Sequence, residues 1–186
     1  MDNNNLNVLV TYATWTGATR EVANFIAETM RKSSLNIDVL PVKNISSIDG
    51  YDCLVFGTSI HAGQPVKGLV NFLRKYSNEV QERPHAFFVV CANMNENTNE
   101  NRTETEDWLM KALDNIGPFH PISIGYFAGA ILTESEEYAQ QNIFLKKVIQ
   151  GMKEKYLGDF GKTDFRDWEA ISQWATELIK LINKKA

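Results

Sequence analysis

The stretch "VLVTYATWTGATREVANFI", residues Val8 to Ile26, decides the fold because it joins two patterns through a short loop. The apolar run that ends at Tyr12 is typical of a buried strand, and apolar residues recur at helical spacing from Gly17 onward. A tight turn from a strand into a helix places free backbone N–H groups and the positive end of a helix dipole in the loop. Such a loop favours an anion.

Three threonine hydroxyls, those of Thr14, Thr16 and Thr19, add hydrogen-bond donors to this loop. A loop for a nucleoside triphosphate also needs a lysine and a magnesium ligand, and neither is present, so we expect a single terminal phosphate. The G-x-G-x-x-G pattern of dinucleotide folds is missing as well, which disfavours a nicotinamide cofactor. The alternative is that the threonines only cap the helix. The "GKT" at Gly161 to Thr163 follows no strand pattern and is interpreted as a turn.

Five short apolar runs alternate with amphipathic stretches along the chain, which predicts an α/β fold with a doubly wound, five-stranded parallel sheet. The link at residues 43–50 between the second and third runs holds no full helix pattern. The final helix has Asp164 or Asp167 as its N-cap, and we assign this ending a structural role. The runs span residues 7–12, 36–42, 51–58, 85–92 and 121–129, and the main helical stripes span residues 22–30, 69–76, 108–113 and 171–181.

The length of 186 residues suits one domain, residues 1–186, and the composition narrows its partners. A net charge of -4 and a pI near 5.4 disfavour a nucleic-acid binder. No apolar run reaches the roughly 18 residues of a membrane span, and the opening residues lack a signal pattern, so we expect a cytoplasmic protein. Cys53 and Cys91 are expected to be buried, reduced thiols, and the three histidines are too scattered for a metal site.

A second stretch, "VFGTSIHAGQP" at residues 55–65, is expected to form a loop after the third strand. Gly57, Gly63 and Pro65 fix this loop, and its small residues let a flat ligand approach the backbone. Ligands of open parallel sheets bind beyond the carboxyl ends of the strands, so this loop should meet the threonine loop and the "CANMNEN" loop at residues 91–97. The alternatives are an ordinary turn and, for His61, a surface histidine.

These motifs together resemble a known family. The pattern of Tyr12, Thr14, Thr16, Gly17 and Thr19 resembles the FMN-phosphate loop of the flavodoxins, and "GTSIHAG" resembles the loop against their flavin ring. The stretches "FGTSIHAGQP", "VVCANMNENTNENRTE", "IGYFAGAI" and "DFRDWEAISQWA" are similar to the flavodoxin-domain family that includes the menaquinone-dependent protoporphyrinogen IX dehydrogenases. This resemblance implies a flavodoxin-like sheet of order 2-1-3-4-5, FMN rather than a metal as the redox centre, and a late insertion at about residues 129–164.

The resemblance also implies which residues bind FMN, and it assigns no catalytic side chain. The third loop departs from the short-chain flavodoxins because residues 92–101 hold no aromatic residue to stack on the flavin. The FMN phosphate falls to Thr14, Trp15, Thr16, Gly17, Ala18 and Thr19; the isoalloxazine ring falls to Thr58, Ser59, Ile60, His61, Ala62 and Gly63, and on its other edge to Ala92, Asn93 and Met94.

Two functions follow from the resemblance. One is an FMN-dependent oxidoreductase that oxidises a tetrapyrrole or another flat reduced substrate and passes electrons to a quinone or another acceptor. The other is an electron carrier between redox proteins. The insertion bears an apolar helical stripe that either packs on the core or forms a lid at the flavin, and its balanced charge between Leu132 and Tyr156 argues against anionic lipid. The acidic third loop, net -4 over residues 93–107 (Glu96, Glu100, Glu104, Glu106 and Asp107 against Arg102), favours the carrier.

Overall fold

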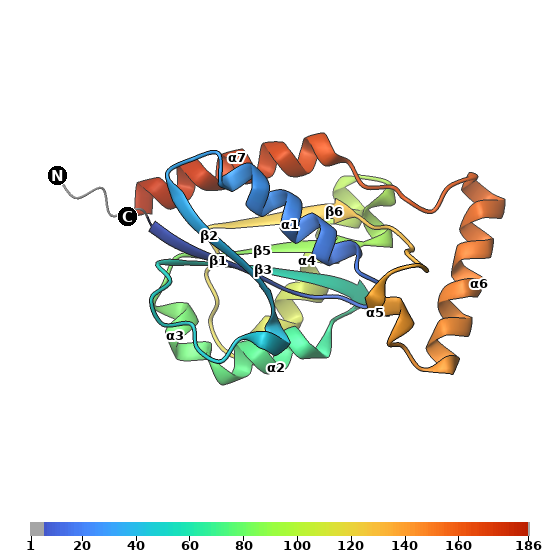
Figure 1. Ribbon diagram of the computed structural model, residues 1–186, viewed down its shortest axis with the longest axis horizontal. Helices are drawn as coiled ribbons and strands as arrows, with labels where there is room; N and C mark the ends of the chain where they lie inside the picture. The colour runs from blue at the N-terminus through green and yellow to red at the C-terminus, as the bar shows by residue number, and fades with distance from the viewer. Residues whose placement is uncertain (1–5, 186) are drawn as a thin grey trace.

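The computed structural model describes residues 6–185, and its centre is a parallel sheet (Figure 1). The parallel strands stand in the order β2-β1-β3-β5-β6. Because β4 is only a two-residue strand that pairs with β3 outside this path, the order of the five parallel strands is the expected 2-1-3-4-5. Residues 1–5 of the opening, where no signal was expected, lie outside the described residues. The strands are β1 (Leu6–Ala13), β2 (Leu35–Pro41), β3 (Cys53–His61), β5 (His85–Cys91) and β6 (Ser123–Ala128).

Helices cover both faces of the sheet, as Figure 1 shows. Each face has its own apolar core, one under α1 and α7 and the other under α2, α3 and α4. All seven residues of β5 are buried, which explains why the apolar run of this strand is continuous. Only a 3₁₀ turn, η1 (Val42–Asn44), joins β2 to β3, so the expected lack of a helix there is confirmed. The helices are α1 (Ala18–Met30), α2 (Lys67–Lys75), α3 (Ser77–Gln81), α4 (Asn99–Asp114) and α7 (Trp168–Lys185).

The insertion is a separate arm that stands beyond the carboxyl ends of the strands (Figure 1). Backbone hydrogen bonds join its two legs, from Ile131 N to Thr163 O at 2.9 Å and from Phe165 N to Gly129 O at 3.1 Å. The arm contains α5 (Glu136–Ala139) and α6 (Ile143–Phe160). Gly161, the first residue of "GKT", ends α6 with a φ of 68°, so this segment is a turn.

The third strand is longer than expected, which corrects the predicted second loop. Gly57, which the sequence analysis placed at the end of the third run and also in the loop after it, lies in the middle of β3, and the strand continues to His61. A tight turn then follows, with positive φ at Ala62 (49°) and Gly63 (72°), and leads into β4 (Gln64–Pro65), which pairs antiparallel with β3. The glycine was misinterpreted because a strand glycine also marks a place where another side chain approaches the backbone closely.

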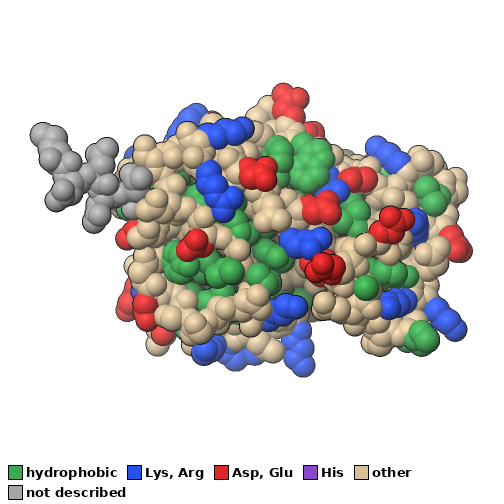
Figure 2. All heavy atoms as spheres, in the orientation of Figure 1, with side chains coloured by type: hydrophobic (Ala, Val, Ile, Leu, Met, Phe, Trp, Pro, Cys, Tyr) green, Lys and Arg blue, Asp and Glu red, His purple; other side chains and the backbone are tan. Residues whose placement is uncertain are grey.

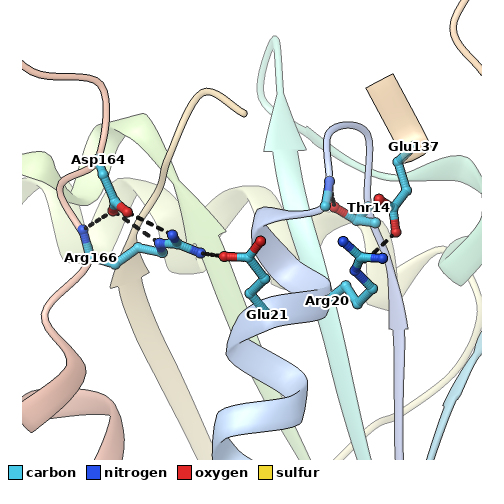
Figure 3. Close-up of polar contacts among 7 residues, drawn as sticks. Thr14, Arg20, Glu21, Glu137, Asp164 and Arg166 are labelled. Atoms are coloured by element: carbon cyan, nitrogen blue, oxygen red, sulfur yellow. Dashed lines mark hydrogen bonds and ion pairs between the residues drawn. The ribbon is translucent and has the colours of Figure 1, made fainter. Parts of the chain in front are cut away.

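The ending has the structural role that the sequence indicated. Asp167 is the cap, since its Oδ1 accepts a hydrogen bond from Ala170 N at 2.9 Å. Asp164 instead pairs with Arg166, whose buried guanidinium also contacts Glu21 Oε2 of α1 at 2.7 Å (Figure 3). This pair ties the start of α7 to the first turn of α1. Both cysteines are free and buried.

The surface is mixed in charge. Figure 2 shows acidic and basic side chains interspersed over one face, with hydrophobic side chains between them. The most exposed large apolar side chains of α6 are Ile143 and Phe144 at its start. Within residues 6–185, no helix combines the length and the apolar character that a membrane crossing requires.

Candidate cofactor site at the carboxyl edge of the sheet

A cavity of about 100 Å³ lies where three loops meet beyond the carboxyl ends of β1, β3 and β5. The three loops that the sequence singled out therefore converge, as expected for a parallel sheet at the point where strand order reverses. Nine of the predicted FMN-binding residues line it: Thr14, Trp15, Thr16, Ala18, Thr19, Ser59, Ile60, His61 and Ala92.

The other six predicted residues lie beside the cavity. The Thr58 hydroxyl accepts a hydrogen bond from Val66 N at 3.1 Å, so it fixes the β3–β4 hairpin. The Asn93 amide donates to Asn101 O of α4 at 3.0 Å, and Met94 is buried in the core. That these six residues bind FMN stays a prediction, and any contact they make would come from their backbone groups. The six are Gly17, Thr58, Ala62, Gly63, Asn93 and Met94.

The threonine loop has the geometry of an anion site rather than of a side-chain cap. The N-cap of α1 is Gly17, with φ of 92°, and no side chain accepts a capping hydrogen bond there. Thr14 Oγ1 instead accepts from Gly17 N at 3.1 Å within the loop (Figure 3). Thr19 is fully buried, and its hydroxyl has no hydrogen-bond partner within residues 6–185. A buried hydroxyl without a partner costs free energy unless a ligand satisfies it.

His61 is half-buried rather than fully exposed, because it lines the cavity and lies against Trp15. The two rings stack with centroids 3.4 Å apart and an interplanar angle of 7°. Burial lowers the pKa of His61 from 6.5 to about 4, so the ring is neutral at neutral pH. Its Nε2 lies 2.9 Å from Ser59 Oγ. The stack presents flat, uncharged surface in the middle of the site.

We expect His61 to make the protein less stable in mild acid. The unfolded chain takes up a proton near pH 6.5 and the folded ring only near pH 4, so unfolding binds a proton between these values. The contribution of His61 to the free energy of unfolding should therefore fall by about 2 kcal/mol as the pH drops from 6.5 to 4, allowing for partial exposure of the ring, and His85, whose pKa burial also lowers, adds to the total fall. Urea denaturation at pH 7 and pH 4.5 measures this fall. His61→Gln should make this fall in the free energy of unfolding smaller, whereas His120→Gln, at an exposed position, should leave it unchanged. Equal falls in the two variants would contradict the assignment of the effect to His61.

The insertion forms the roof of the cavity. Ile149, Met152 and Tyr156 of α6 face into it, together with Phe165 from the returning leg. The sequence had singled out this stripe but left packing and lid as alternatives. Ile149 is the one buried residue of α6, so the helix covers the cavity rather than a face of the sheet.

Sequence reasoning missed several residues that line the cavity, of which Asn95 and Phe165 matter most for a ligand. Asn95 lines the cavity, and its Oδ1 is buried without a hydrogen-bond partner within residues 6–185. Phe165 lies next to Tyr156, with ring centroids 5.7 Å apart, so aromatic surface comes from the insertion although the third loop has none. Asn95 could have been predicted, because it lies one residue beyond the predicted Ala92–Met94 segment. Phe165 could not, because its position next to the cavity depends on the fold of the arm.

A parallel sheet of order 2-1-3-4-5, with a cavity lined by the loops after β1, β3 and β5 at its switch point, defines the flavodoxin-like class of α/β proteins. The family model described as flavodoxin domain matches residues 9–157. The chain therefore belongs to the flavodoxin domain family, and the resemblance stated from the sequence is confirmed.

Individual relatives agree with this assignment. The chain is 27% identical over 182 residues to the protein named protoporphyrinogen IX dehydrogenase [quinone] of Escherichia coli (strain K12), covering 96% of this chain and 98% of that protein. Among solved structures, oxidised flavodoxin 2 from Bacillus cereus is similar with a TM-score of 0.58 and 14% identity, over 97% of this chain and 99% of that one. Fusobacterium nucleatum flavodoxin bound to flavin mononucleotide has a TM-score of 0.52 and 14% identity, over 94% and 97%. These structures support the fold.

Proposed function

We propose that this protein binds FMN in the cavity at the carboxyl edge of the sheet and acts as an FMN-dependent oxidoreductase, resembling protoporphyrinogen IX dehydrogenase, that passes electrons to a quinone or another acceptor. The observation that carries the proposal is the cavity itself, which joins the threonine loop, the Trp15–His61 stack and an apolar roof from the insertion. The full-length similarity to the Escherichia coli dehydrogenase supports it.

The residues present fit FMN. The backbone N–H groups at the start of α1 and the unpartnered Thr19 hydroxyl can donate hydrogen bonds to its phosphate. The unpartnered Asn95 oxygen can accept a hydrogen bond from an N–H or O–H group of the cofactor. When bound, FMN supplies the hydride and electron chemistry, while the protein sets its orientation and surroundings. Backbone groups at Ser59–Gly63 and Ala92–Met94 are proposed to hold the ring edges.

The site must open to admit this cofactor. The cavity volume of about 100 Å³ is below the roughly 300–1,000 Å³ of small-molecule pockets. The Trp15–His61 stack occupies the middle of the site, and a planar ring system is the kind of ligand that replaces one face of such a stack. We therefore propose that Trp15 and His61 separate or shift when FMN binds.

The roof suits an apolar reduced substrate. Ile149, Met152 and Tyr156 offer mostly hydrophobic surface, and burial raises the pKa of Tyr156, so this phenol stays protonated at neutral pH. A roof of this kind excludes water from the flavin side of the cavity. A largely apolar tetrapyrrole matches that surface, and a quinone headgroup matches it equally.

One anaerobic experiment tests the activity. In stopped flow, reduced protoporphyrinogen should reduce the bound FMN, and a menaquinone analogue should reoxidise it. Met152→Lys places a charge in the roof and should slow reduction at least about tenfold with FMN affinity unchanged. Leu157→Lys makes the same charge change on α6 at a side chain that does not line the cavity and whose exposure, 47%, is close to the 41% of Met152, so its rate should stay within about twofold of wild type. Equal rates in the two variants would contradict a substrate site under α6.

A carrier function is the second candidate, and the acidic surface at the start of α4 favours it. Residues 93–107 carry five acidic side chains against Arg102 alone. Glu96 directly follows η2 (Ala92–Asn95), whose last residue lines the cavity, and the other four lie on α4. A carrier would ignore the porphyrinogen, take up electrons in two separate one-electron steps during dithionite titration, and exchange them with a basic redox protein at a rate that falls with salt. This set of results would replace the enzyme proposal with the carrier.

A further inference from the structure

The insertion contacts the outer side of the threonine loop through a segment that we call the foot, residues 135–141. Gln141 Nε2 of the foot donates to Trp15 O at 2.8 Å. At Gly17, an added Cβ would lie 2.8 Å from Glu137 Oε2 and 3.2 Å from Ser135 Cβ. The insertion, 118 or more residues further along the chain, therefore covers one side of the loop that is proposed to hold the FMN phosphate.

The carboxylate of Glu137 is only half satisfied in this position. Its Oε1 pairs with Arg20 Nε of α1 at 3.2 Å (Figure 3), whereas its Oε2 is buried and has no hydrogen-bond partner within residues 6–185. A buried carboxylate oxygen without a partner costs free energy. Its place beside Gly17, at the positive end of the α1 dipole, offsets part of that cost because a helix N-terminus attracts negative charge.

Glu137 thus supplies a negative charge to the same helix end that is proposed to bind phosphate. We infer that Glu137 is an internal competitor of the cofactor phosphate, held by Arg20, and that it lowers the affinity of the site for FMN. This inference rests on the proposed FMN site. A phosphate and a carboxylate at one helix end repel each other, so binding of the cofactor must work against the foot in its present position.

The inference couples the cofactor to the roof. The foot is joined to α6 by one residue, Asn142, which is also the N-cap of α6. Lys146 of α6 donates back to Ala139 O of the foot at 2.7 Å, so the two segments move together. If a bound phosphate repels the carboxylate of Glu137 from the outer side of the loop, the roof over the cavity shifts with the foot. The cavity, which is too small for FMN in this arrangement, gains room in the same step.

Glu137→Gln tests this competition, because the substitution removes the charge and keeps the size. We expect the Kd for FMN, measured by quenching of flavin fluorescence, to fall by about tenfold. Arg20→Gln should raise it by about threefold, since Glu137 then stands without its cation. Glu136→Gln, the same charge change on the neighbouring residue of α5, should stay within about twofold, as no ion pair joins Glu136 to the loop in the described part of the chain.

Riboflavin, which has no phosphate, separates competition from a general effect on the site. Its Kd should be equal in wild type and Glu137→Gln within about twofold. Equal FMN affinity in wild type and Glu137→Gln, or an equal gain for riboflavin and FMN, would overturn the inference and leave the FMN site standing. Failure of the wild type to bind FMN at all would overturn the proposed function and this inference with it.

Discussion

Thr16→Asp is expected to abolish tight FMN binding, with a rise in Kd of at least about 100-fold. Thr16 lines the cavity in the loop before α1, where the phosphate is proposed to lie. A carboxylate there opposes a phosphate dianion in a partly buried site, and a 100-fold change needs only about 2.7 kcal/mol. The substitution should not harm the fold, because an acidic side chain near a helix N-terminus is favourable. Titration of the purified apoprotein with FMN, followed by fluorescence quenching, gives the affinity.

Thr16→Asn is the matched control, since it has the shape of aspartate without the charge. It should weaken FMN binding much less, by about tenfold or less. Thermal unfolding of both apoprotein variants should agree with wild type within a few degrees. If Thr16→Asp and wild type bind FMN equally, the phosphate does not lie in this loop and the site assignment is wrong.

The sequence predicted the parts of the site that depend on local pattern. Strand β1, the turn at Gly17 and the start of α1 all follow from a short continuous stretch in which apolar spacing changes from strand to helix. The convergence of three loops also followed, because parallel strands place their carboxyl ends at one edge whatever the details of packing.

The parts that escaped prediction depend on contacts between distant segments. The foot contacts the threonine loop through Gln141 and Glu137, and nothing in the local spacing of residues 135–141 indicates that partner. A deletion of residues 133–156 would remove these contacts together with the roof. A change in FMN binding by such a variant would therefore reflect the loss of the foot and the loss of the roof at once. Point substitutions in α6 separate the two roles.

Gly57 shows the same limit, because the residue that requires a glycine at this position lies on the neighbouring strand. The sequence analysis assigned it, at the end of the third run, to the approach of a flat ligand, but in the fold it pairs with Phe88 across β3 and β5. The Phe88 ring lies over the glycine, so that an added Cβ would be 2.1 Å from Cζ of this ring. Phe88 is fully buried and packs near Trp174, with ring centroids 6.2 Å apart, which leaves the ring little room to yield.

Gly57→Ala is therefore expected to destabilise the fold by about 3 kcal/mol, the upper part of the range for overpacking in a core. For a chain of this size the loss lowers Tm by roughly 6 to 12 °C, measurable by calorimetry of the apoprotein. Gly151→Ala in α6 is the control: nothing lies within 4 Å of its added Cβ, so the change should be neutral or stabilising by up to about 1 kcal/mol.

The partner of Gly57 gives the deciding comparison. Phe88→Leu removes ring atoms from the contact, so the cost of Gly57→Ala in that background should fall well below its cost in wild type, and a double-mutant cycle measures the difference. If Gly57→Ala instead kept full stability and lost FMN affinity, the glycine would serve the approach of the cofactor. The expected result is the reverse, because a side chain of the core, rather than the flavin, already covers the space that a larger residue would take at this position.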